Sequence, residues 1–100
     1  MPILVKIHQA YREVIAVCDS ELIGKKFEQD NRQLEVTEDF FKGKEMTEEE
    51  VIALIKEKTA DDASFNFAGE KAVQAAAKAG VIDKECIMKV QGIPYALVLI

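Results

Sequence analysis

The sequence is poor in the residues that build metal sites and disulfide frameworks. Its 100 residues include no tryptophan, one histidine and two cysteines. A metal site containing His8 would need carboxylates for its other ligands. Cys18 and Cys86 lie far apart in apolar stretches, without a CxxC motif or a Cys/His pair at zinc spacing. We therefore expect no metal and no other cofactor, and two free, buried thiols in a reducing compartment.

Long apolar runs and an excess of basic residues are also missing. No run approaches the roughly 20 residues of a membrane-spanning helix, and residues 1–9 lack the features of a signal peptide. The formal net charge is −5. Proteins that coat nucleic acids are usually basic, because Lys and Arg contact the phosphates. We expect a cytoplasmic protein without membrane contact or non-specific DNA binding.

The apolar pattern predicts a single domain over residues 1–100, with strands near both ends of the chain. The first two predicted strands are close enough to form an antiparallel hairpin, and the last two flank a Gly92–Pro94 loop. Between them we expect a single turn that holds Leu22 and ends at Gly24, and a Phe40–Phe41 pair that folds back onto the core. The predicted strands span residues 3–9, 13–18, 32–36, 86–91 and 95–100.

Two helices are predicted in the second half of the chain. Thr47–Glu50 is a T-x-x-E capping box followed by apolar residues at helical spacing, which predicts a helix over 48–59. An alanine-rich stretch before Gly80 predicts a second helix over 67–79. The order of elements favours the α+β class, as a two-layer sandwich of a mainly antiparallel sheet with two helices packed on one face.

Four short motifs recur in a family pattern: Y-R-E at the hairpin, C-D-x-E-L-x-G-K after the second strand, N-x-x-G-E at the second helix and G-x-P near the end. Over nearly its whole length the chain thereby resembles a small archaeal family, domain of unknown function family 424. The resemblance implies a two-layer α/β sandwich and an archaeal cytosolic origin, but no established activity. Tyr95 departs from the pattern, which would place a histidine there, and this puts a ring-nitrogen role in doubt. The matching residues are Tyr11, Arg12, Glu13, Cys18, Asp19, Glu21, Leu22, Gly24, Lys25, Asn66, Gly69, Glu70, Gly92 and Pro94.

The stretch Asn66–Glu70, at the start of the second predicted helix, allows two interpretations. Free N–H groups at a helix N-terminus attract phosphate or carboxylate, and Asn66 would orient such an anion. Alternatively, Asn66 is the N-cap, Glu70 completes the first turn and Gly69 permits close packing. The second interpretation is favoured, since Glu70 would repel an anion.

Acid–base and nucleophilic chemistry have weak support in the sequence. A pair of His8 with Asp19 or Glu13 would suit proton transfer, but alternation places His8 on the face opposite Ile3, Val5 and Ile7, towards solvent. Cys18 lies in the apolar run VIAVC, which favours an inert, structural thiol.

Two hypotheses about function follow. The first is a non-catalytic binding or adaptor module with a protein or ribonucleoprotein partner, for which the translation machinery is the preferred setting. A homodimer through the terminal strand is a further alternative. The second is a small enzyme or small-anion binder that uses Asp19, Glu70, His8 and Arg12. It predicts that these side chains converge in a pocket, whereas an exposed apolar patch around Tyr95 would favour protein association. The module's candidate surface comprises Tyr11, Arg12, Asp19, Gly24, Lys25, Asn66, Gly69, Glu70, Gly92 and Pro94.

Overall fold

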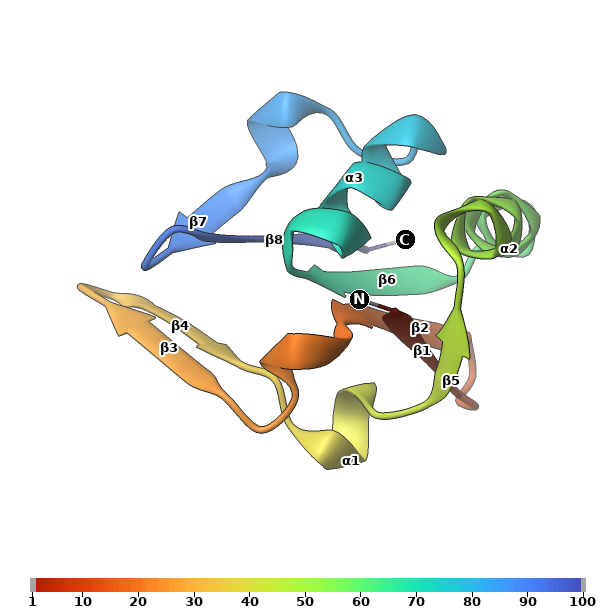
Figure 1. Ribbon diagram of the computed structural model, residues 1–100. Coiled ribbons are helices and arrows are strands. Elements are labelled where there is room, and N and C mark those ends of the chain that lie inside the picture. Colours follow the sequence, from red (N-terminus) through yellow and green to blue (C-terminus); the bar gives the residue numbers. More distant parts are fainter. Residues whose placement is uncertain (1, 100) are drawn as a thin grey trace.

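A computed structural model describes residues 2–99, which form one six-stranded sheet, a separate two-stranded hairpin and three α-helices (Figure 1). The strand order in the sheet is β5-β1-β2-β6-β8-β7, and β3 pairs with β4. The helices are α1 (Glu38–Phe41), α2 (Glu48–Ala60) and α3 (Glu70–Lys78), and short 3₁₀ turns span Ser20–Leu22 and Lys84–Cys86. The strands are β1 (Ile3–His8), β2 (Val14–Asp19), β3 (Lys26–Gln29), β4 (Arg32–Glu35), β5 (Lys44–Met46), β6 (Ser64–Ala68), β7 (Met88–Val90) and β8 (Ile93–Val98).

The sheet is antiparallel except at its centre, where β2 and β6 run parallel. A parallel pair requires a long crossover, and here the crossover contains the β3–β4 hairpin, α1, β5 and α2. The mainly antiparallel sheet that the sequence predicts is therefore confirmed, together with the first hairpin, in which Ile3 opposes Asp19 and His8 opposes Val14.

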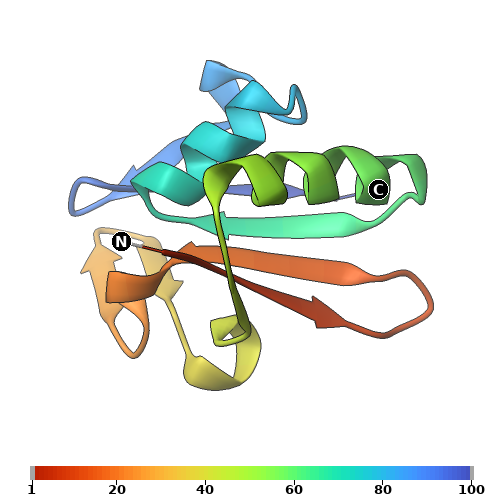
Figure 2. The same ribbon diagram turned by 45° about the vertical axis from the view of Figure 1, so that its right-hand side comes forward.

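Helices α2 and α3 cover one face of the sheet, as predicted (Figure 2). Thr47 and Glu50 form both hydrogen bonds of the capping box, so α2 begins where the T-x-x-E pattern places it. The main core lies between these helices and the sheet. It includes Ile15, Val17, Val51, Ile55, Phe65 and Phe67. The buried alanines of α3 let its backbone lie close to the strands, since they occupy little space between them.

The other face of the sheet is covered over part of its area by α1 and the β3–β4 hairpin (Figure 1). Phe41 is buried there beside Leu34 and Val36, which confirms that the Phe40–Phe41 pair folds back onto the core. The tip of the hairpin is tied to β7, because Arg32 donates a hydrogen bond to the Lys89 carbonyl. The sequence analysis did not predict that α1 and the β3–β4 hairpin cover part of this face of the sheet.

The helix prediction over 67–79 is wrong at its start. Residues 64–68 form β6, which lies between β2 and β8 in the sheet, and α3 begins at Glu70. Phe65 and Phe67 both point to the helix-covered side, with ring centroids 5.5 Å apart. This placement also rules out Asn66 as an N-cap, because the N-cap of α3 is Gly69.

The terminal hairpin also differs from its prediction. β7 begins at Met88 rather than residue 86, since Lys84–Cys86 form a 3₁₀ turn. Gln91 and Gly92 form the loop, both with positive φ, so Ile93 and Pro94 belong to β8. The predicted last strand extended to residue 100, which lies outside the described residues.

Over residues 2–99, none of the helices is long and apolar enough to cross a membrane.

Candidate functional site

The N-terminus of α3 is already occupied by a carboxylate of the chain itself. Asp19, the last residue of β2, is 4% exposed. Its two carboxylate oxygens accept hydrogen bonds from the backbone N–H groups of Ala72, at 2.9 Å, and Lys71, at 3.1 Å. These N–H groups are the ones that a bound anion would use at a helix N-terminus. The α3 N-terminus is therefore closed to an external anion while Asp19 stays in place.

Gly69 makes this contact sterically possible. Its φ is +107°, and a Cβ atom at this position would meet the Asp19 carboxylate, with both oxygens 2.7 Å away. Its own N–H donates to the carbonyl of Pro94 at 2.8 Å. Asp19, Gly69 and Pro94 thus form one buried junction between β2, α3 and β8, and all three have structural roles.

Burial has an electrostatic effect on Asp19. Removal of the carboxylate from water raises its pKa above the ordinary value, while the hydrogen bonds from Ala72 and Lys71 lower it less than burial raises it. Glu21 nearby raises the pKa further. The arrangement is that of a buried capping carboxylate and does not by itself indicate proton transfer to a substrate.

Two of the other predicted acid–base residues, His8 and Arg12, lie far from Asp19, whereas Glu70 is adjacent in sequence to the residues that contact it. His8 and Arg12 belong to the far end of the β1–β2 hairpin, five residue steps from Asp19 along the strands, or about 17 Å. His8 is half-buried under α1, with its ring stacked on Phe40 and its Nε2 atom 2.8 Å from the Phe40 carbonyl oxygen. The imidazole therefore interacts with Phe40, and it lies under α1 rather than in open solvent. Glu70 is exposed at the start of α3.

The loop residues of the predicted surface divide between the two ends of the sheet. Tyr11 and Arg12 are exposed at the far end, and the Tyr11 side chain makes almost no contact with the rest of the chain. Gly24 and Lys25, at the Asp19 end, exchange backbone hydrogen bonds with Val36, and Gly92 forms the β7–β8 turn. The structure does not bring the predicted residues together on one surface.

The two cysteines are free, as predicted, but only Cys18 is buried. Burial raises the pKa of the Cys18 thiol to about 12, and the nearby carboxylates of Asp19 and Glu21 raise it in the same direction. Cys86 is exposed in the 3₁₀ turn before β7, so the prediction that it is buried is wrong. Over residues 2–99, no three His, Cys, Asp or Glu side chains are grouped in a way that would hold a metal ion.

These environments predict a large difference in thiol reactivity. In the native protein, an aromatic disulfide reagent should modify Cys86 within the mixing period and leave Cys18 unmodified, because thiolate is the reactive form. In denaturant both thiols should react. The Cys86→Ser variant serves as the control and should show no rapid reaction. Two thiols reacting at equal rates in the native protein would contradict the burial of Cys18.

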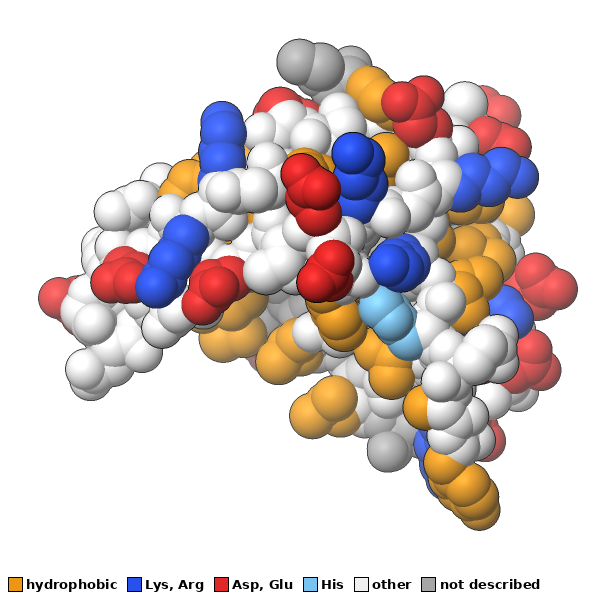
Figure 3. Space-filling model, turned by 90° about the horizontal axis from the view of Figure 1, so that it is seen from below, with side chains coloured by type: hydrophobic (Ala, Val, Ile, Leu, Met, Phe, Trp, Pro, Cys, Tyr) orange, Lys and Arg blue, Asp and Glu red, His pale blue; other side chains and the backbone are white. Residues whose placement is uncertain are grey.

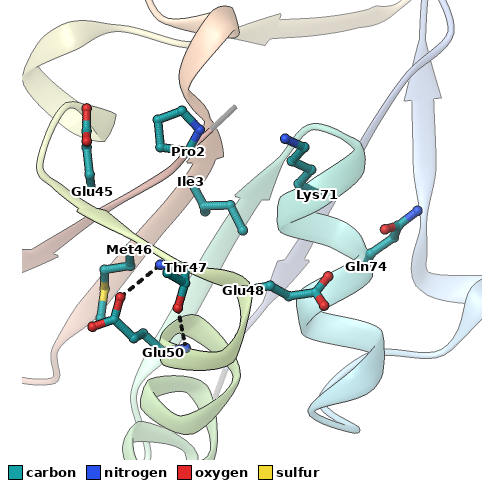
Figure 4. A pocket seen from close by; sticks show the side chains of 9 residues that line it. All are labelled: Pro2, Ile3, Glu45, Met46, Thr47, Glu48, Glu50, Lys71 and Gln74. Atoms are coloured by element: carbon teal, nitrogen blue, oxygen red, sulfur yellow. Dashed lines mark hydrogen bonds between the residues drawn. The ribbon is translucent and has the colours of Figure 1, made fainter.

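A pocket of about 520 Å³ lies where the starts of β1, α2 and α3 meet (Figure 4). Pro2, Ile3 and Met46 provide apolar walls, and three glutamates and Lys71 provide charge. Two of those glutamates have intramolecular partners: Glu50 accepts from the Thr47 N–H, and Glu48 pairs with Lys78 at 2.8 Å. The carboxylates disfavour an anion, and Lys71 and the N-terminus of α2 disfavour a cation. The charges around this pocket therefore select no class of ligand.

An uncharged surface lies on the sheet face that carries α1, beyond the area that α1 and the β3–β4 hairpin cover. Strand alternation places residues of β2, β6 and β8 there, with Val14 opposite Ser64 and Asn66 opposite Leu97. Leu97 is 48% exposed and Leu99 76% exposed, and the other members are half-buried. We call this surface the open face; it comprises Val14, Ser64, Asn66, Tyr95 and Leu97, together with Leu99, the residue after β8, which continued alternation assigns to the same side.

The view from below, onto this side of the sheet, shows how charge is distributed around the open face (Figure 3). Apolar side chains gather across the lower middle of the view, whereas Lys, Arg, Asp and Glu side chains intermingle above them and over the β3–β4 hairpin. The sequence did not reveal the open face, because its exposure depends on where α1 and the hairpin pack. The apolar strand YALVLI was the one available signal.

Comparison with known proteins identifies the family of this chain and a solved structure with a similar fold. A solved structure from Methanopyrus kandleri, titled "Crystal structure of an uncharacterized conserved protein", is similar to this chain with a TM-score of 0.86 and 26% sequence identity. The similarity covers 98% of this chain and 90% of that one. No functionally curated protein matches. The family model "Protein of unknown function (DUF424)" matches residues 7–100, and the chain therefore belongs to this family.

Proposed function

We propose that this protein is a non-catalytic protein-association module and that its open face is the docking surface. The observation that carries the proposal is the chemistry of that face. None of its six residues is charged, in a chain in which 31% of residues are charged. Interface centres are depleted of charge and enriched in apolar and aromatic side chains, and an exposed patch of this kind on a monomer often has a binding role.

The positions of the candidate catalytic groups support a module over an enzyme. An enzyme that used Asp19, His8 and Arg12 would need them within reach of one substrate. Asp19 instead contacts α3 through both oxygens, and His8 contacts Phe40 at the other end of the hairpin. Neither side chain lines the pocket beside α2 and α3.

A partner that contains RNA is the alternative within the same class, and the charges favour a protein. Lys26 forms an ion pair with Glu28 at 2.9 Å, and Arg32 donates to a backbone carbonyl. Basic and acidic side chains alternate over the β3–β4 hairpin instead of forming a continuous basic surface (Figure 3). RNA affinity depends on such a surface and on aromatic side chains for stacking.

Affinity capture with a variant of the open face tests the proposal. Ser64 lies within the open face, and among residues 2–99 its side chain forms no hydrogen bond. Ser64→Lys should place a charge at the docking surface and reduce the capture of a protein partner at least about tenfold, since burying an unpaired charge is costly. The matched control is Ala53→Lys, which adds the same charge to the exposed side of α2.

Each bait is incubated with lysate in parallel with and without ribonuclease, and protein and RNA are measured in the eluate. We expect a stoichiometric protein partner that survives ribonuclease with wild type and Ala53→Lys and is lost with Ser64→Lys. An added lysine would preserve or strengthen a phosphate contact. Capture that depends on RNA and persists in Ser64→Lys would therefore contradict the proposal, as would equal protein capture by all three baits.

A further inference from the structure

Strand β8 has an edge that β7 leaves partly vacant. β7 pairs with Ile93–Tyr95, and the register ends with Met88 opposite Tyr95. Upstream of Met88 the chain turns away into the Lys84–Cys86 turn on the helix side of the sheet (Figure 1). Within the described residues, Ala96–Val98 therefore pair with β6 alone.

The direction of the peptide groups on β8 follows from the hairpin. Val90 and Ile93 flank a two-residue turn, and such a pair exchanges both of its hydrogen bonds. Ile93 and Tyr95 therefore direct their N–H and C=O groups towards β7, and Pro94 directs its carbonyl the opposite way, towards Gly69. By the same alternation, Leu97 directs its N–H and C=O groups into the vacant stretch.

This stretch lacks the features that usually protect an edge strand. Natural edges carry lysine, proline or a bulge, or are covered by another element. Residues 96–99 read Ala-Leu-Val-Leu, with no charge and no proline, and their pairing with β6 through Val98 is regular. The two exposed leucines stand beside the unpaired peptide groups of the same strand.

We propose that the vacant edge of β8 pairs with the same edge of a second copy of this chain. The proposal goes beyond the proposed function, because this edge borders the open face and the pairing leaves both open faces uncovered. A second copy fits because its own residues 96–99 are uncharged and its β8 carries the same unpaired groups up to Val98. Antiparallel pairing about a two-fold axis therefore brings no like charges together along these residues.

The position of β7 selects the register of this pairing. If Leu97 opposed its own copy, Leu99 of the second copy would lie against Tyr95, where Met88 already pairs. A two-fold axis at Val98 avoids this conflict and places Leu97 opposite Leu99 of the second copy, twice. Leu97 directs its N–H and C=O groups to the shared edge, and continuation of the strand by one residue on pairing would give Leu99 the same direction. Two open faces then join into one apolar surface.

The contact is short, so we expect a weak dimer, with a dissociation constant of about 10 μM or higher. Sedimentation equilibrium over a concentration series, with the purified chain of residues 1–100, measures it. Leu97→Glu places a charge at the paired edge and should raise the dimer dissociation constant at least about tenfold. The control, Ile7→Glu, changes another exposed aliphatic residue, on β1, and should leave the constant unchanged. Hydrogen exchange should show the Leu97 amide gaining protection as wild-type concentration rises.

A wild-type chain that stays monomeric over the whole series would overturn the second-copy inference. A dimer that forms equally well with Leu97→Glu would overturn the proposed edge. The two proposals fail separately: a monomer that still captures another protein through Ser64 retains the proposed function and loses this inference. A dimer that Leu97→Glu disrupts supports the inference, whatever the capture experiment shows.

Discussion

Replacement of Gly69 by alanine is expected to destabilise the protein by about 3 kcal/mol or more, which is a large share of the roughly 5–15 kcal/mol that holds a typical domain folded. Two effects combine at this position. The φ of +107° is strained for any residue with a Cβ atom, and that atom would overlap the Asp19 carboxylate. Asp19 has no room to yield without losing its hydrogen bonds to α3.

Gly80 is the matched control for Gly69. It also has a positive φ, of +80°, but a Cβ atom there would meet no heavy atom within 4 Å. Gly80→Ala therefore reports the backbone effect without the overlap, with an expected cost of about 1 kcal/mol. Urea unfolding followed by circular dichroism measures both variants. Equal losses of stability would show that the contact between Gly69 and Asp19 is not tight.

Replacement of Asp19 by alanine should cost about 2–4 kcal/mol, the second largest effect that we expect. The change leaves the N–H groups of Lys71 and Ala72 without their acceptor near the buried start of α3. Asp19→Asn retains one acceptor oxygen and should lose less. Asp39→Ala, at an exposed position in α1, is the control and should change the free energy of unfolding little. A cost for Asp19→Ala no larger than that of the control would refute the capping role.

The same residue predicts a pH dependence. The pKa of Asp19 is raised in the folded protein, above the value of about 3.8 for the free side chain. The folded state therefore binds this proton more tightly than the unfolded state. Binding of this proton to Asp19 therefore stabilises the folded state. The stabilisation is complete below about pH 3.8 and is lost as the pH rises through the folded-state pKa. The free energy of unfolding of wild type, relative to that of Asp19→Asn, should fall as the pH rises from about 3.8 through the folded-state pKa of Asp19.

Sequence patterns correctly predicted those elements that depend mainly on residues close together in the chain. The capping box at Thr47 and Glu50 placed the start of α2, and alternation placed the β1–β2 hairpin. β6 was missed although Phe65 and Phe67 alternate with polar residues in the manner of a strand. The polar residue Asn66, followed by glycine and an alanine-rich segment, suggested a helix start instead.

The candidate sites depend on contacts between distant residues, which sequence patterns do not specify. Asp19 reaches the N-terminus of α3 across more than fifty positions, so the sequence did not indicate that a carboxylate of the chain itself occupies the predicted anion site. The open face depends on the packing of α1 and the β3–β4 hairpin, which cover one part of the sheet and leave Leu97 and Leu99 exposed. Both features follow from tertiary packing.

Photo-crosslinking tests the role of the open face most directly, since the probe reports contacts without adding charge. A photoreactive amino acid is placed at Leu99, on the open face, and in a separate chain at Glu57, on the exposed side of α2. The account predicts a discrete protein crosslink from position 99, to another protein or to a second copy, and none from position 57. Crosslinks from position 57 alone, or crosslinks to RNA from either position, would contradict it.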